Sequence, residues 1–186
     1  MVIGLGLECY NLLLVPTGNE IMFDDELLVV NGTNKLNFGE VSSLIASFPF
    51  VNSYTPKDMS QGSDPECYFV FADGSCIIEI EINAGSIEAN RVVEEISIRF
   101  AVTNPIDTFQ KALQICEDVS IKLNMQIIDM RLKAVIDLAN DLVLAKSKKA
   151  FEEKRVRFYK MYNLPIDTWA KPMHCGKALF DELRNQ

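Results

Sequence analysis

The residues best suited to chemistry in this sequence are carboxylates that recur on neighbouring predicted strands. Glu79 and Glu81 alternate with isoleucines, so they share one strand face, and Glu94 or Glu95 lies near them if the register of the next strand allows. Clustered carboxylates support acid–base catalysis or bind a divalent metal. The same row is also typical of the solvated face of a half-buried sheet, or of an acidic docking surface.

The single histidine, His174, adjoins Cys175 in the sequence. A Cys–His nucleophile pair needs converging side chains, whereas those of adjacent residues usually diverge. One histidine among scattered cysteines also lacks the ligand spacing of a zinc site. The cysteines are odd in number and form no Cys-x-x-Cys pair, which favours a reducing cytoplasm over a disulfide framework. They are Cys9, Cys67, Cys76, Cys116 and Cys175.

The sequence lacks the motifs of the common enzyme classes. Gly4-Leu-Gly6 has neither the third glycine nor the following helix of a phosphate-binding loop, and there is no nucleophile elbow, zinc-protease motif or calcium loop. An ordinary hydrolase or transferase is therefore disfavoured. We expect no catalytic residue, no metal and no cofactor.

A basic run with interleaved aromatic residues lies near the C-terminus, over residues 146–160. Basic and aromatic side chains together can bind single-stranded nucleic acid, but Glu152 and Glu153 interrupt the run and the rest of the chain is acidic. We therefore expect an intramolecular role, with the basic helix against or beside an acidic sheet face and its aromatic residues packed. The run comprises Lys146, Lys148, Lys149, Phe151, Lys154, Arg155, Arg157, Phe158, Tyr159 and Lys160.

The carboxylates are positioned by a predicted antiparallel meander of three strands, over residues 67–71, 76–82 and 92–102. Asp73-Gly74 supplies the positive φ angles of a tight hairpin between the first two strands. Alternation gives the third strand one apolar face, which includes Ile96 and Ile98, and one polar face, which includes Arg99. The sequence predicts one buried and one polar face for this sheet.

A capped amphipathic helix follows the meander. Asn104 is placed to cap it and Pro105 to occupy its first position. An apolar stripe from Ile106 to Leu123 is expected to cover the apolar face of the meander, and Asn124 suits the C-terminal end of the helix. Residues 125–128 are short and apolar, so we expect them to return to the sheet.

Around this centre the sequence predicts further strands, a short helix and a loop. Residues 7–15 and 26–30 read as strands, and Asn31-Gly32 signals a hairpin whose return strand begins at Leu36. Residues 38–48 have helical spacing, and residues 51–66 read as a long loop. The region 132–162 is helical in pattern, as one helix or as two that break at Asn140-Asp141, and a last short helix follows residue 176.

The totals favour a single α+β domain over residues 1–186, with an acidic body and a basic helical extension. Residues 131–186 hold 12 of the 18 Lys and Arg residues and 7 of the 26 Asp and Glu residues, which gives a net charge of +5. The remaining 6 basic and 19 acidic residues give residues 1–130 a net charge of −13. An acidic body favours a basic partner and disfavours nucleic acid. No apolar run is long enough to span a membrane, and no signal-peptide pattern occurs, so we expect a cytoplasmic protein.

The chain resembles the bacterial immunity proteins that neutralise polymorphic or contact-dependent toxins. The resemblance rests on Glu95-Ile-Ser-Ile-Arg-Phe-Ala101, Asn104-Pro105 and the helix end Leu123-Asn-Met-Gln-Ile-Ile-Asp129, with the small size, acidic pI and meander-plus-helix fold. It implies a cytoplasmic protein that binds a toxin domain, often a nuclease, through acidic residues. It transfers no functional residue, so the expected interface consists of exposed carboxylates: Glu79, Glu81, Glu94, Glu95, Asp58 and Asp64.

Three functions are therefore open. The first is a non-enzymatic protein-binding module that neutralises a basic partner such as a toxin domain. The second is a small enzyme or ligand-binding protein that uses the carboxylate face with residues 52–66 as a lid, and it predicts an enclosed pocket where two carboxylates converge and a pKa is raised. The third is a nucleic-acid or assembly module, which predicts an exposed basic face on the helix at 146–160.

Overall fold

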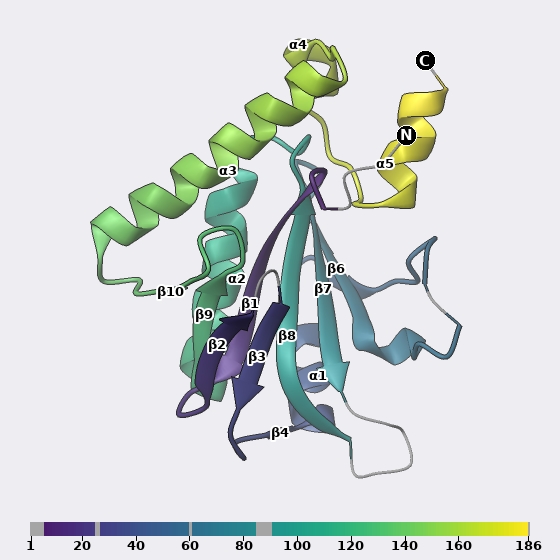
Figure 1. The fold of residues 1–186 in the computed structure, drawn as a ribbon. Coiled ribbons are helices and arrows are strands. Elements are labelled where there is room, and N and C mark those ends of the chain that lie inside the picture. The colour runs from purple at the N-terminus through teal and green to yellow at the C-terminus, as the bar shows by residue number, and fades with distance from the viewer. Residues whose placement is uncertain (1–5, 25–26, 60, 85–90, 186) are drawn as a thin grey trace.

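The computed structural model describes residues 6–24, 27–59, 61–84 and 91–185 and has an α+β fold (Figure 1). Its main sheet is antiparallel, with the order β10-β9-β1-β8-β7-β6-β5, and the short β4 also pairs with β8. These strands are β1 (Cys9–Pro16), β4 (Leu36–Asn37), β5 (Val51–Ser53), β6 (Tyr68–Ala72), β7 (Ile77–Ala84), β8 (Val92–Ala101), β9 (Met125–Asp129) and β10 (Ala134–Ile136).

The predicted meander is confirmed as β6, β7 and β8, preceded by the 3-10 turn η1 (Pro65–Cys67). Gly74 adopts a φ of 88° in the hairpin turn, and Asp73 accepts hydrogen bonds from the backbone N–H groups of Ser75 and Cys76. The prediction that residues 125–128 return to the sheet is also confirmed, because β9 pairs with β1. The strands predicted at residues 7–15 and 125–128 thus lie side by side as β1 and β9.

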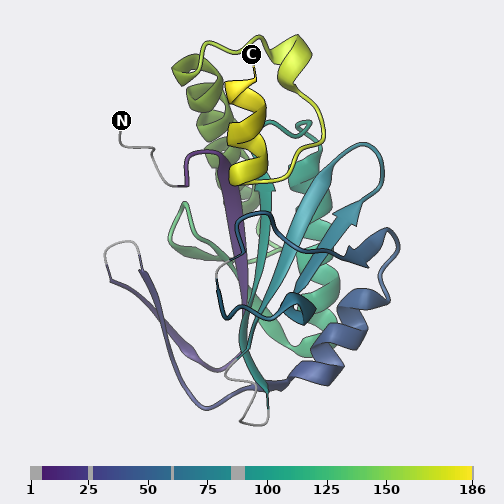
Figure 2. The same cartoon turned by 90° about the vertical axis from the view of Figure 1, so that its right-hand side faces the viewer.

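Two helices cover the apolar face of the sheet, which we call the helix face (Figure 2). They are α1 (Phe38–Ala46), where a helix was predicted, and α2 (Thr108–Leu123). The predicted start of α2 is wrong. Asn104 is fully buried, and its side chain makes no capping bond to α2. Its Oδ1 accepts from the N–H groups of Ile77 and Met173, and its Nδ2 donates to the backbone carbonyls of Ala101 and Met173. The helix therefore begins only after this junction.

The C-terminal region contains one strand and three helices rather than a continuous helical pattern. Residues 134–136 form β10, so the helical pattern expected before Asn140 is wrong. The helix α3 (Asp141–Met161) begins at the Asn140 cap, where the break at Asn140-Asp141 was predicted. Phe151 of α3 packs on Tyr10 and Phe109, which places α3 beside α2 (Figure 1). Two short helices follow, α4 (Ile166–Trp169) and α5 (Lys177–Arg184).

A second sheet of two strands, β2 (Glu20–Asp24) and β3 (Leu27–Asn31), covers part of the opposite side of the main sheet (Figure 2). Its inward residues, such as Phe23 and Leu28, pack against Leu13, Val15 and Ile128 in a small second core. The sequence predicted a hairpin at Asn31-Gly32 that joins residues 26–30 to a strand from Leu36, and that prediction is wrong. The strand β3 pairs with the preceding strand β2, whereas Leu36 pairs with β8. Glu26, which was predicted to open this strand, lies outside the described residues.

Candidate functional site

The candidate site lies on the side of the main sheet opposite α1 and α2, which we call the far face. The sheet register places Glu79 opposite Arg99, Glu81 opposite Ser97, and Asn83 opposite Glu95 on adjacent strands. The predicted convergence of carboxylates on one face is therefore present. The expectation that this face is simply solvated is wrong, because Glu79 and Ser97 are buried, with exposed fractions of 3% and 7%.

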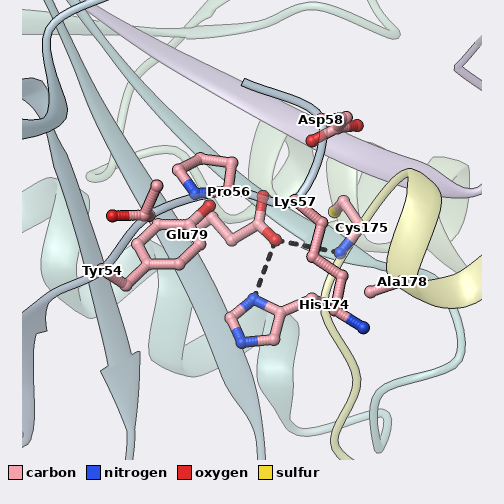
Figure 3. A pocket seen from close by; sticks show the side chains of 9 residues that line it. Tyr54, Pro56, Lys57, Asp58, Glu79, His174, Cys175 and Ala178 are labelled. Carbon is pink, nitrogen blue, oxygen red and sulfur yellow. Dashed lines mark hydrogen bonds and ion pairs between the residues drawn. The ribbon is translucent and has the colours of Figure 1, made fainter.

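Glu79 is held by three donors in the interior of the far face. Arg99 Nε lies 2.6 Å from Oε2. Figure 3 shows the other two donors, His174 Nδ1 and the backbone N of Cys175, each 3.0 Å from Oε1. Burial opposes ionisation of this carboxyl, but the hydrogen bond from His174 and the positive charge of Arg99 outweigh it, so the pKa of Glu79 is lowered. The carboxylate is charged and fully engaged within the protein.

A cleft of about 140 Å³ opens above this group, beneath the segment that follows β5. Tyr54 stacks on the ring of His174, with ring centroids 5.2 Å apart, and burial together with the charge of Glu79 raises the pKa of Tyr54. Pro56, Asp58 and Ala178 complete the walls shown in Figure 3. The predicted loop thus does lie over the carboxylate face.

His174 belongs to the site, although its position in the sequence predicted neither a Cys–His nucleophile pair nor a metal ligand. Its role needs no convergence with Cys175, because its partner is Glu79 from a strand distant in the sequence. Since the ionised Glu79 can only accept, Nδ1 of a neutral His174 carries the proton and Nε2 carries the lone pair. One sequence signal could have pointed to it, namely a single histidine between Met173 and Cys175, but no pattern identifies Glu79 as its partner.

Three other carboxylates lie on the far face, namely Glu81, Glu94 and Glu95, which we call the far-face carboxylates. Glu94 and Glu95 line a hollow of about 310 Å³ whose opposite wall is made by Leu28 and Val30 of β3. Burial, together with the charges of Glu81 and Glu94, raises the pKa of Glu95 despite a hydrogen bond from Asn83. Negative charge is therefore crowded at this hollow.

The remaining predicted interface residues have partners inside the protein or at its surface. Asp64 forms an ion pair with Arg91 and caps η1 through the N–H of Glu66, so it is a structural residue. Asp58 is exposed and lies 3.5 Å from the backbone N–H of Lys177. Glu94 is exposed and pairs with Lys35 at 2.7 Å.

The basic helix α3 does not lie against the far face. Its aromatic residues pack as expected, but they pack into the core of the helix face, and Arg155 donates to the backbone carbonyl of Asn104. The prediction that this helix pairs with an acidic sheet face is therefore wrong. Within the described residues, the ion pair of α3 joins Lys149 to Glu153 of the same helix. Five of its basic side chains are exposed: Lys146, Lys148, Lys149, Arg157 and Lys160.

No protein-family model, curated protein or solved structure matches this chain. Within the described ranges, no three His, Cys, Asp or Glu residues are grouped so that they could hold a metal ion. A search of the same residues found no helix with the length and apolar character to cross a bilayer.

Proposed function

We propose that this chain is a non-enzymatic protein-binding module, of the immunity-protein kind, that receives a basic partner such as a bacterial toxin domain on its far face. The observation that carries the proposal is that Glu94 and Glu95 line one hollow, where burial and the charges of Glu81 and Glu94 raise the pKa of Glu95. A cation placed there would relieve this repulsion.

The shape of the hollow fits a lysine or arginine side chain of a partner. Leu28 and Val30 offer an apolar wall for the aliphatic stem, while Glu94 and Glu95 face the charged end. The β2–β3 hairpin, which carries Glu20 and Asp24 at exposed positions, extends the acidic surface beyond the hollow. Charge complementarity of this kind speeds association and selects the partner.

The proposal is tested with an arginine–glycine repeat peptide as the probe, by calorimetry at about 50 and 200 mM salt. Glu81→Gln/Glu95→Gln is expected to weaken binding about five-fold, which corresponds to about 1 kcal/mol. Glu117→Gln/Asp118→Asn removes the same charge from α2 on the other side of the sheet and should change binding less than two-fold. Equal losses in both double variants, or no binding by the wild-type chain, would contradict the proposal.

A natural partner is then sought by co-purification from the host at both salt concentrations. A basic protein that the wild-type chain retains and Glu81→Gln/Glu95→Gln loses would support the proposal. A neighbouring gene for a secreted toxin supplies the first partner to test directly.

The two alternative functions have less support. For an acid–base enzyme, the cleft does bring Asp58 and Glu79 together, but the pKa of Glu79 is lowered and its oxygens are occupied by three donors. For a nucleic-acid module, the exposed lysines of α3 provide positive charge, but the aromatic residues that would stack on bases, Phe151, Phe158 and Tyr159, are buried.

A further inference from the structure

Two cysteines from opposite ends of the sequence meet on the far face. Cys9 begins β1 opposite Ala101 of β8, two residues from the position that pairs Asn11 with Arg99, so the register places it on the same face as the Glu79–Arg99 pair. Cys175 reaches that pair from the C-terminal segment, because its N–H donates to Glu79. Burial raises the pKa of the Cys175 thiol, and the interactions with Cys9 and with the charge of Glu79 raise that pKa further.

The surroundings of this thiol pair set it apart from the other cysteines. Arg99 is paired with Glu79, and its positive charge acts on both thiols. Cys9 is half-buried, whereas Cys175 has an exposed fraction of 5%. Cys67, Cys76 and Cys116 lie in η1, in the hairpin after β6 and in α2, so they provide built-in controls.

We propose that Cys9 and Cys175 are an oxidation site at which a peroxide converts the thiol pair into a disulfide. The more accessible Cys9 reacts first: its thiolate sulfur attacks the peroxide, an S–O bond forms, the O–O bond breaks, and the sulfur is oxidised while the peroxide is reduced to water or an alcohol. The sulfur of Cys175 then attacks the sulfenic acid. The S–S bond forms, the S–O bond breaks, and the thiol proton leaves with the hydroxyl as water.

The disulfide would fix the C-terminal segment to the central sheet. Met173, His174 and Cys175 already contact Asn104 and Glu79 through hydrogen bonds, which orders this segment without any covalent link. A bond between Cys175 and β1 closes a loop that spans nearly the whole chain. Long closed loops restrict the unfolded chain most strongly, so oxidation is expected to raise the melting temperature by about 5–10 °C.

The test uses the purified full chain, oxidised with a small excess of hydrogen peroxide and then labelled with N-ethylmaleimide after unfolding. The reduced chain should take up five labels, one for each cysteine, and the oxidised chain two fewer. Digestion should yield one cross-linked peptide pair joining Cys9 to Cys175, and dithiothreitol should restore both the labels and the original melting temperature.

Matched variants separate this site from general thiol oxidation. Cys175→Ser and, independently, Cys9→Ala should each abolish the paired loss of labels. Cys67→Ser is the matched control, because Cys67 is half-buried like Cys9 but lies outside the pair, and it should retain the paired loss. The proposal is overturned if peroxide leaves all labels in place, links Cys67, or yields dimers on a non-reducing gel. Sulfinic acid on Cys9 with Cys175 unchanged would overturn it as well.

Discussion

At the scale of single residues, Glu79 and Glu81 show how far a sequence pattern reaches. Both occupy the same face of β7, as alternation predicts. Their environments differ because Arg99, His174 and Cys175 converge on Glu79 alone, while Glu81 is half-buried beside a more open surface. Alternation assigns a face, but it does not say which distant segment covers each position on that face.

Removing the charge of Glu79 is expected to destabilise the fold. Glu79→Gln leaves Arg99 without its ionised partner in a largely buried setting, and we expect a loss of about 2 kcal/mol in the free energy of unfolding at neutral pH. Because the pKa of folded Glu79 is lowered, its contribution is present above the unfolded pKa and is lost as pH falls through the folded pKa. Urea unfolding at neutral and acidic pH measures both effects.

Glu94→Gln is the matched control for that experiment. It removes a carboxylate whose ion pair with Lys35 is exposed on both sides, with side-chain exposed fractions of 59% and 42%. Such pairs contribute under about 0.5 kcal/mol, and screening by salt reduces them further. A loss in Glu94→Gln as large as that in Glu79→Gln would refute the distinction between the two carboxylates.

Glu95 is expected to behave in the opposite way. Burial and the neighbouring carboxylates raise its pKa in the folded protein, so its favourable contribution is present below the unfolded pKa and is lost as pH rises through the folded pKa. Glu95→Gln should therefore be more stable than the wild type at neutral pH, and the difference should vanish in acid. Thermal unfolding across this pH range checks it. A stability gain that persisted unchanged in acid would show that ionisation of Glu95 is not its cause.

At the scale of elements, local signals succeeded where the structure is locally determined. The hairpin at Asp73-Gly74, α1 and the C-terminal residue Asn124 of α2, with a φ of 52°, are as predicted, except that Gly74 has a positive φ and Asp73 does not. Signals failed where a tertiary contact competes for the same residue. Asn104 has the chemistry of a helix cap, but its four hydrogen bonds join β7, β8 and the C-terminal segment instead.

The two helix starts provide a direct test of this reading. Asn140 accepts from the N–H groups of Leu142 and Val143 at the start of α3, whereas Asp107 at the start of α2 makes no side-chain capping bond. Asn140→Ala is expected to cost about 1 kcal/mol of stability, and Asp107→Ala only a few tenths. Chemical denaturation compares them, and equal costs would show that capping does not explain the difference.

At the scale of the whole molecule, the far face is assembled from both ends of the chain. The β2–β3 hairpin covers Leu13 and Val15, while the segment around His174 and Cys175 covers Glu79. The sequence predicted the sheet and the helix face because periodicity is a local property. The second layer was not predicted, because no strand was expected over residues 20–24, the strand at 26–30 was expected to pair with one from Leu36, and the segment around His174 has no periodic pattern.

The central place of β1 has a consequence for synthesis on the ribosome. This strand is made before both of its neighbours in the sheet, because β8 and β9 follow it by about 75 residues or more along the chain. At about 5–20 residues per second, translation leaves the apolar β1 without its partners for seconds after it emerges. The nascent chain must therefore stay soluble through that interval. Aggregation through the unpaired β1 is the hazard that this topology creates, and chaperone binding to β1 would prevent it.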